Sequence, residues 1–174
     1  MQTKTAFAIL VTIFIGVSQH AIGQKWIPLN QKEYSIKAPG DWSVDVSKQM
    51  GTDLVVFSML ENSNDKFREN VNVMIQNMAG KNMDLEKYTA ISINQIKTMA
   101  ADGKIEESKT VKAGNSSYQK IIYTATQAGL KLKFEQYYFI ANNKAYVITL
   151  TTEVNKFEIF RPEGEEILNS FLLK

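Results

Sequence analysis

The stretch LKLKFEQYYFIANNKAYVITLTT, residues 130–152, has the strongest pattern in the chain and decides the fold. Two runs rich in β-branched and aromatic residues, 130–140 and 145–152, flank Asn142 and Asn143. Asparagine tolerates the positive φ that a two-residue hairpin turn requires. The stretch therefore predicts a β-hairpin that turns at this pair of asparagines.

Closing the hairpin at that turn divides its side chains between two faces. One face is mostly aromatic and aliphatic, with Phe139 opposite Tyr146, Tyr137 opposite Ile148, and Glu135 opposite Leu150. The other face is apolar near the turn and more polar away from it, with Phe134, Gln136, Tyr138 and Ile140 opposite Thr151, Thr149, Val147 and Ala145. Both apolar surfaces need covering by further strands or by a helix. Lys133, which alternates with apolar neighbours, is expected at the surface.

The composition indicates one ordinary globular domain. The chain has 174 residues, of which 44% are hydrophobic and 22% charged. Its 20 Lys and Arg residues against 18 Asp and Glu residues give a net charge of +2. The basic residues are scattered and only Arg68 and Arg161 are arginines, so no phosphate-binding stripe is present. We therefore expect no nucleic-acid partner.

The first residues match a secretory signal peptide. Lys4 precedes an apolar run at residues 6–17, and the small-x-small triplet that ends in Gly23 places the cleavage site before Gln24. The apolar run is shorter than the roughly 20 residues of a membrane span, and an uncleaved anchor is the alternative. With no cysteine for lipid attachment, we expect residues 1–23 to be removed. Residues 24–174 then form a single secreted or periplasmic domain with no stable membrane span.

Cleavage would leave a chain with neither histidine nor cysteine, because the only histidine is His20. This excludes Ser-His-Asp and Cys-His catalytic arrangements from the mature chain, together with the usual zinc, copper and haem ligands. We expect no cofactor and no enzymatic activity. Stability must come from the hydrophobic core, since no disulfide can form.

The rest of the chain reads as strands and helices around the hairpin. The period-two pattern of residues 42–46 places Trp42, Val44 and Val46 on one side of a strand, with Trp42 in the core. Residues 54–60 read as a strand buried on both faces. Three- and four-residue steps predict a helix over residues 84–101, capped by Asp84 and stopped by Gly103. Strands are also expected at 34–38, 71–78, 106–111 and 117–126, and a turn of two or three residues at 127–129. The C-terminal segment reads as two helices divided at Pro162.

This order of elements and several local sequences resemble the PsbP-like and DcrB-like group of small secreted α+β proteins. The resemblance rests on YSIKAPGDW at residues 34–42, the strands up to Met78, the helix at Asp84, residues 136–140 with their tight turn, and ILNSF at residues 167–171. It implies an antiparallel sheet of about six to eight strands flanked by a central helix and a C-terminal helix. It also implies an accessory or binding role, and no catalytic motif accompanies it.

Three further parts of the sequence carry charged residues that could form a site. Asp41, Asp45 and Asp53 lack the loop spacing of a calcium site and read as solvated turn carboxylates. The adjacent Glu165 and Glu166 would point in different directions on a helix, which disfavours an acid–base pair. Arg161 is consistent either with anion binding or with capping of nearby carbonyl groups.

The leading functional hypothesis is a non-enzymatic accessory protein that acts through protein–protein contacts with an unidentified envelope protein. The alternative is a carrier of a small apolar ligand or lipid, in which Phe134, Tyr138, Ile140 and Val147 would line a pocket between sheet and helix. A hydrolase that uses carboxylates is the third hypothesis. The sequence assigns no ligand-binding or partner-binding residue.

Overall fold

The computed structural model describes residues 25–99, 102–114 and 116–174. The expected cleavage site between Gly23 and Gln24 therefore lies outside the described residues. All strand pairs are antiparallel, and the strands form two sheets. The larger sheet has seven strands in the order β3-β4-β5-β9-β8-β7-β6, and the smaller has the order β1-β2-β10. The chain has the α+β fold that was predicted.

The strands of the larger sheet are β3 (Ser43–Asp45), β4 (Leu54–Phe57), β5 (Asn70–Asn77), β6 (Lys104–Ala113), β7 (Ser116–Gln127), β8 (Leu130–Ala141) and β9 (Lys144–Glu153). The strands of the smaller sheet are β1 (Trp26–Asn30), β2 (Tyr34–Pro39) and β10 (Leu172–Leu173). The helices are α1 (Leu85–Met99) and α2 (Phe157–Asn169), with short 3-10 turns η1 (Gln49–Gly51) and η2 (Val154–Lys156).

The central hairpin β8–β9 has the predicted register. Phe139 pairs with Tyr146, Tyr137 with Ile148, and Glu135 with Leu150. Both turn residues adopt positive φ, 51° at Asn142 and 57° at Asn143. The preceding turn has two residues, since Gln127 pairs with Leu130. Ala128 and Gly129 form it with φ of 51° and 80°.

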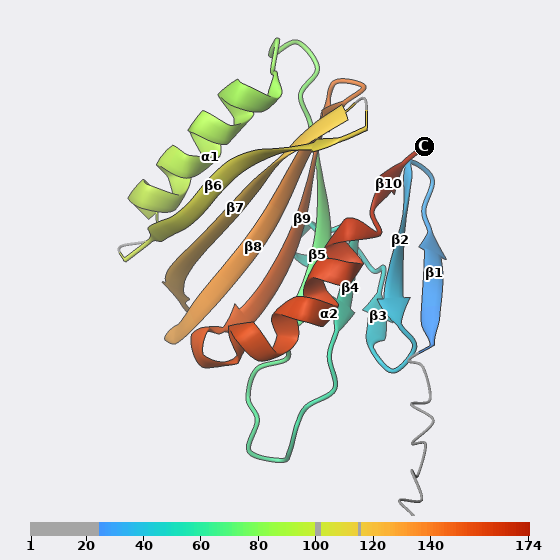
Figure 1. The fold of residues 1–174 in the computed structure, drawn as a ribbon, viewed down its shortest axis with the longest axis vertical. Coiled ribbons are helices and arrows are strands. Elements are labelled where there is room, and N and C mark those ends of the chain that lie inside the picture. The colour runs from blue at the N-terminus through green and yellow to red at the C-terminus, as the bar shows by residue number, and fades with distance from the viewer. Residues whose placement is uncertain (1–24, 100–101, 115) are drawn as a thin grey trace, which may run out of the picture.

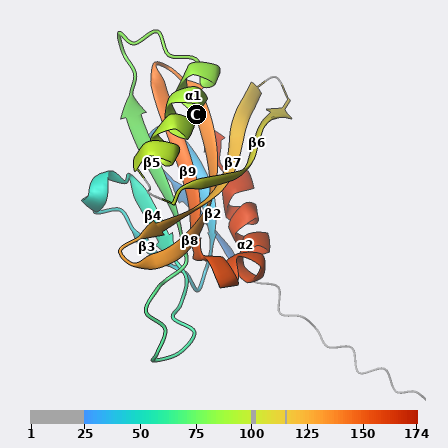
Figure 2. The ribbon, with the colours of Figure 1, turned by 90° about the vertical axis from the view of Figure 1, so that its left-hand side faces the viewer.

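The larger sheet lies between two layers that contact opposite faces (Figures 1 and 2). On one face, α2 and the smaller sheet bury the main core, which includes Tyr34, Ile148, Leu150, Phe157 and Ile167. On the other face, α1 packs over a second cluster, where the rings of Tyr88 and Tyr138 meet edge to face at 5.3 Å. The part of the hairpin that the sequence marks as apolar, near the Asn pair, is the part that α1 covers.

Helix α1 begins where the sequence predicts. The side-chain Oδ1 of Asp84 accepts a hydrogen bond of 2.8 Å from the backbone N–H of Lys87, and the backbone carbonyl of Asp84 accepts one from Tyr88. This is the geometry of an N-cap. The helix ends at Met99.

Four sequence-based expectations are wrong. The strand expected over residues 54–60 ends at Phe57, and Met59 and Leu60 are exposed. Pro162 does not divide the C-terminal segment, because α2 runs through it as a single helix. Val44 and Val46 are exposed although Trp42 is buried, because β3 is a three-residue strand at the edge of the sheet. Lys133 is not a surface residue: its side chain is only 17% exposed, pairs with Glu106 at 2.8 Å and lies 4.2 Å above the ring of Phe157.

Candidate functional site

The α1-facing side of the larger sheet has a groove where α1 does not reach. It has a volume of about 540 Å³ and lies toward the β7–β8 turn, over β5, β9 and β8. A smaller space of about 190 Å³ adjoins it beneath α1 and shares Asn72, Met74 and Gln136 with it. We call the two together the sheet groove.

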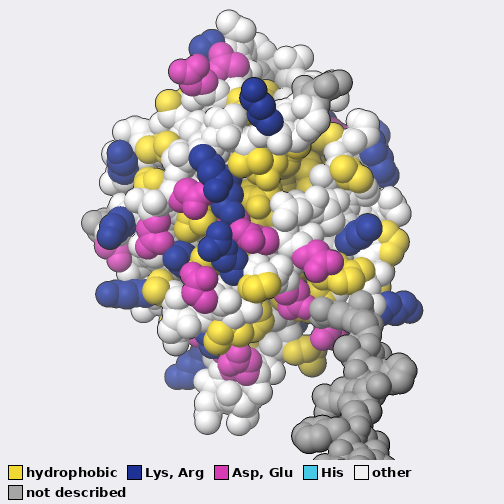
Figure 3. Space-filling model, viewed as in Figure 1, with side chains coloured by type: hydrophobic (Ala, Val, Ile, Leu, Met, Phe, Trp, Pro, Cys, Tyr) yellow, Lys and Arg dark blue, Asp and Glu magenta, His cyan; other side chains and the backbone are white. Residues whose placement is uncertain are grey.

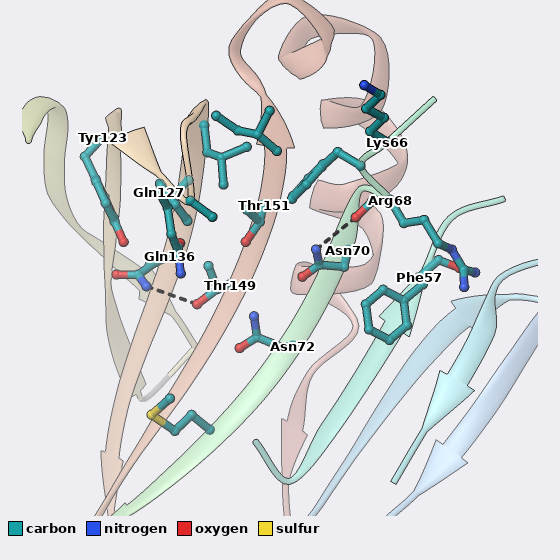
Figure 4. Close-up of a pocket in the computed structure, with 16 residues that line it drawn as sticks. Phe57, Lys66, Arg68, Asn70, Asn72, Tyr123, Gln127, Gln136, Thr149 and Thr151 are labelled. Carbon is teal, nitrogen blue, oxygen red and sulfur yellow. Dashed lines mark hydrogen bonds between the residues drawn. The ribbon is translucent and has the colours of Figure 1, made fainter. Parts of the chain in front are cut away.

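The floor of the sheet groove consists of neutral hydrogen-bonding side chains from three neighbouring strands. Asn70 and Asn72 of β5 pair directly with Thr151 and Thr149 of β9, and Gln136 of β8 pairs with Thr149. These positions face the groove because they alternate with the core residues of each strand. Figure 4 shows the floor between Tyr123 on one side and Phe57 and Arg68 on the other.

Hydrogen bonds hold part of this floor in place. Gln136 donates from Nε2 to Thr149 Oγ1 at 3.1 Å and accepts from the Tyr138 hydroxyl. Asn70 donates from Nδ2 to the carbonyl of Arg68 at 3.0 Å. Among the described residues, no side-chain hydrogen bond of Asn72 or Thr151 is found. These two side chains are therefore free to bind a ligand.

One wall of the sheet groove is apolar. Leu130, Leu132 and Phe134 occupy alternate positions of β8, and Tyr123 of β7 stacks on Phe134 with 4.6 Å between ring centroids. Burial raises the pKa of Tyr123 to about 12. Its hydroxyl is therefore neutral at physiological pH and can donate a hydrogen bond.

The opposite wall is cationic and comes from the segment between β4 and β5. Arg68 lies over the ring of Phe57, 5.1 Å from its centroid. Its Nε donates to the carbonyl of Ser58 at 2.7 Å, and its Nη2 donates to Ser43 Oγ at 2.6 Å. Lys66 is exposed beside it. No Asp or Glu lines either part of the sheet groove as the structure describes it, so its charge is positive.

The segment that carries this wall is fastened by Lys156, which follows β9. The Lys156 Nζ lies 3.3 Å from Glu61, 3.2 Å from Asp65, 3.8 Å from Glu69 and 3.4 Å from Glu153. Burial acts to lower the pKa of Lys156, but hydrogen bonds with Asp65 and Glu61 outweigh it and raise the pKa. The ammonium therefore stays charged and holds the loop against the end of β9.

A second group of charges lies on the opposite face, between α2 and the sheet. Lys120 Nζ contacts the fully buried Glu135 and, at 2.8 Å, Glu165 of α2. Arg161 Nε lies 3.1 Å from Glu165 and 3.5 Å from Glu135. Basic and acidic side chains are interleaved over this face (Figure 3). These ion pairs link side chains of α2 to side chains of β7 and β8 and so hold the helix against the sheet.

The two carboxyl groups in this cluster have opposite pKa shifts. Burial raises the pKa of Glu135. Burial also acts to raise the pKa of Glu165, but hydrogen bonding and the charges of Lys120 and Arg161 outweigh it and lower the pKa. A pair of this kind can serve acid–base catalysis when it borders a substrate site. Neither residue lines the sheet groove.

The acidic residues that the sequence offered as candidate metal or acid–base sites make other contacts. Asp45 accepts a hydrogen bond from the N–H of Ser47 at 2.7 Å, and Asp53 binds Lys48 at 3.0 Å and the Tyr34 hydroxyl at 2.9 Å. No group of three acidic or histidine residues is placed to hold a metal ion in the part of the chain that the structure describes. Glu166 is exposed and takes no part in the contacts of Glu165 with Lys120 and Arg161.

The four residues of the apolar-pocket hypothesis are divided by α1. Tyr138 and Val147 pack under the helix, and Ile140 packs against the same cluster. Phe134 lies in the open wall of the sheet groove. No sequence pattern pointed to Asn70, Asn72, Lys66 or Arg68 as binding residues. The signal for the floor was the polar end of the second hairpin face, together with Asn alternating with Val in residues 70–73.

No protein-family model matches the sequence, and no curated protein matches it either. Solved structures do match. CyanoP, the cyanobacterial PsbP of Synechocystis sp. PCC 6803, aligns with a TM-score of 0.67 and 14% identity over 92% of this chain and 99% of that one. PA94 of Pseudomonas aeruginosa, a protein of unknown function, aligns with a TM-score of 0.61 and 12% identity over 86% and 97%.

A third match is LpqN of Mycobacterium tuberculosis, described as involved in cell envelope biogenesis. It aligns with a TM-score of 0.59 and 9% identity over 87% of this chain and 92% of that one. At these identities the likeness concerns the fold. The chain therefore has the PsbP-like fold that the sequence resemblance implied. No helix within the described residues has both the length and the apolar character needed to cross a membrane.

Proposed function

We propose that this protein is a non-enzymatic binding protein of the cell envelope, secreted or periplasmic, which holds part of a partner macromolecule in the sheet groove. The observation that carries the proposal is the groove itself. Its floor presents amide and hydroxyl groups, some of them without an internal partner, between an apolar wall and a cationic one. Concave sites of this size with a few convergent polar groups are the usual location of binding.

The chemistry of the groove favours binding over catalysis. Catalysis needs a nucleophile, acid or base placed in the concave site. The ionisable side chains in the groove are Lys66, Arg68, Tyr123 and, beneath α1, Tyr88 and Tyr138. Within the described residues, no carboxylate or histidine lines the groove beside the threonine hydroxyls of the floor, and Glu135 and Glu165 lie on the opposite face.

The envelope location rests on the predicted signal peptide. An apolar run followed by a small-x-small triplet before Gln24 is the pattern of an exported protein. LpqN, which shares the fold, is described as involved in cell envelope biogenesis. Both observations support export and neither identifies a partner.

The test is a pull-down of envelope extract with the C-terminally tagged protein, exported and purified from its own host. Asn72→Tyr fills the floor of the groove, whereas Asn94→Tyr makes the same change at an exposed position of α1 outside it. We expect a defined partner that is recovered by the unchanged protein and by Asn94→Tyr, and at least tenfold less by Asn72→Tyr. Urea melts of both variants check that they are folded. Equal recovery by both variants would place the binding surface elsewhere, and recovery of no partner would contradict the proposal.

A carrier of a small apolar molecule is a second proposal, favoured by the wall of Leu130, Leu132 and Phe134. The space enclosed beneath α1 counts against it, since about 190 Å³ is smaller than the roughly 300–1,000 Å³ of typical small-molecule sites. Mass spectrometry of the native protein tests it. A lipid that co-purifies with the unchanged protein and is lost in Asn72→Tyr would favour the carrier over the macromolecular partner.

A further inference from the structure

We propose that the sheet groove binds an extended peptide segment of the partner, in which a carboxylate accompanies aliphatic side chains at alternate positions. This inference rests on the proposed function and adds the chemical class of the ligand. Three features of the groove carry it: the spacing of its floor, the sign of its charge and the repeat of its apolar wall.

The floor has the repeat of an extended polypeptide. Asn70 and Asn72 are two residues apart on one face of β5, and Thr151 and Thr149 stand directly opposite them on β9. Same-face positions of a strand are about 6.4–6.8 Å apart. An extended peptide laid along β5 presents its own peptide groups on one side at the same interval. The spacing of the floor side chains therefore matches the spacing of the peptide groups along such a ligand.

The groups on the floor are complementary to peptide groups. An asparagine amide both donates and accepts, as a backbone peptide group does. The Asn72 amide and the Thr151 hydroxyl make no side-chain hydrogen bond within the described structure, so a ligand can use them without breaking an internal bond. Gln136 is already bonded to Thr149 and Tyr138, and it serves to orient the floor.

The charge of the groove selects an anion. Lys66 and Arg68 stand at one wall, and no Asp or Glu lines the described groove to neutralise them. Arg68 is fixed through Nε and Nη2, whereas its Nη1 has no hydrogen-bond partner among the described residues and is open to a ligand. A carboxylate at this wall would form a charge-assisted hydrogen bond. A neutral glycan has no group that uses both cations.

The apolar wall repeats at the same interval as the floor. Leu130, Leu132 and Phe134 lie on one face of β8, two residues apart. In an extended peptide every second side chain points the same way. Aliphatic side chains at alternate positions would therefore meet this wall while the peptide groups face the floor.

The test begins with a phage-displayed library of random octapeptides, selected on the exported, purified protein. The same library is selected in parallel on Asn72→Tyr and on Asn94→Tyr. We expect enriched sequences on the unchanged protein and on Asn94→Tyr that combine Asp or Glu with aliphatic residues at alternate positions, and no such enrichment on Asn72→Tyr. Enrichment that is the same on all three proteins, or that lacks acidic residues, would overturn the inference.

Synthetic peptides then test the contact with the cationic wall by fluorescence anisotropy. Replacing the acidic residue by its amide should weaken binding at least fivefold to the unchanged protein. The same replacement should have little further effect on Lys66→Gln combined with Arg68→Gln, because the contact is already lost. Equal weakening on both proteins would show that the carboxylate binds elsewhere and would overturn the assignment. Hydrogen–deuterium exchange of the double variant verifies its fold.

A chito-oligosaccharide hexamer serves as the competing probe in the same assay. Binding of this glycan that is lost in Asn72→Tyr, with no peptide enriched, would overturn the peptide inference. The proposed function would survive that result if the envelope pull-down still depended on Asn72. Loss of groove dependence in the pull-down as well would overturn both.

Discussion

Glu69 has no exposed surface, and both of its carboxylate oxygens lack a hydrogen-bond partner among the described residues. Its Oε1 lies 3.8 Å from Lys156 Nζ, at the far end of the group that fastens the groove wall. Burial raises the pKa of Glu69 and outweighs the opposing effects of the backbone N–H groups of Glu69 and Glu153 and of the Lys156 charge. The ionised form is therefore disfavoured in the folded protein.

The sign of the resulting pH dependence follows from this shift. A carboxyl group with a raised pKa binds its proton more tightly in the folded chain than in the unfolded one. Stability therefore falls as pH rises from the ordinary value of 4.5 through the folded pKa. We expect Glu69→Gln to remove this contribution. The free energy of unfolding of the variant, relative to the unchanged protein, should be higher at pH 7 than at pH 4.5.

Urea unfolding at a series of pH values measures this difference, and the acid response of the other carboxylates is common to both proteins. A matched control is Glu166→Gln, at an exposed position of α2. A constant difference between Glu69→Gln and the unchanged protein across the pH range would mean that Glu69 is not forced toward its neutral form.

The buried charges mark the limit of sequence reasoning at the scale of single residues. The pairing of Glu135 with Leu150 was predicted, and it places a carboxylate on the core face. Its partners were not predictable, because Lys120 comes from β7 and Arg161 from α2. Lys133 was misplaced for the same reason: alternation along one strand does not reveal the ring of Phe157 above it.

At the scale of the elements, α2 lies close against the sheet at Gly164. A Cβ added there would lie 2.5 Å from Leu150 Cδ2 and 2.7 Å from its Cδ1. Leu150 has no exposed surface, so its side chain has little room to move. Glycine at this position lets the helix lie directly on β9.

Two effects oppose each other in Gly164→Ala. Alanine favours the helix by about 1 kcal/mol over glycine, whereas overpacking a core costs about 1–3 kcal/mol. We expect a net loss of about 1 kcal/mol in the free energy of unfolding, measured by urea melts. Leu150→Val removes both Cδ atoms, so the double variant should lose at least 0.5 kcal/mol less than the sum of the single variants. Strict additivity would show that the two side chains do not meet.

Elements were predictable where the signal is local. The hairpin at Asn142 and Asn143 and the helix cap at Asp84 are each encoded within a few residues. Pro162 was misread because a proline usually interrupts a helix, and here the burial of Phe157, Ile167 and Leu168 on both sides of it keeps α2 continuous. Strand β10 has two residues and pairs with β2 from the other end of the chain, so no local pattern announces it.

At the scale of the whole molecule, the two helices are held unequally. Helix α2 buries Phe157, Gly164, Ile167 and Leu168. In α1, the residues whose side chains are described include two buried ones, Tyr88 and Ser92. Opening free energies follow the number of buried apolar contacts. The backbone amides of α1 should therefore exchange with deuterium at least tenfold faster than those in the second half of α2.

Native-state hydrogen exchange at pH 7 measures this ranking, and the amides of β9 provide the reference for global unfolding. Equal protection of the two helices would mean that α1 is held by more than the described cluster under it. A ligand of the sheet groove should slow exchange in α1, because Ser92, Gln95 and Ile96 line the space beneath it.

The groove itself is a property of the whole molecule, and this is why the sequence did not reveal it. Its floor joins β5, β9 and β8, and its cationic wall belongs to the segment before β5. The alternation of each strand was readable, and it indicated where one face turns polar. Which part of that face α1 would leave open depends on the packing of the helix.

The two turns at the ends of β8 are suitable positions for attaching a label or a linker to this protein. The turn at Ala128 borders the sheet groove, whereas the turn at Asn142 and Asn143 lies at the other end of a twelve-residue strand, about 40 Å away along an extended chain. Since the chain contains no cysteine, a single introduced thiol would be the only one. A fluorophore on the turn at Ala128 would report whether a ligand occupies the sheet groove. A linker on the turn at Asn142 and Asn143 would fix the protein to a solid surface with the groove pointing away from that surface.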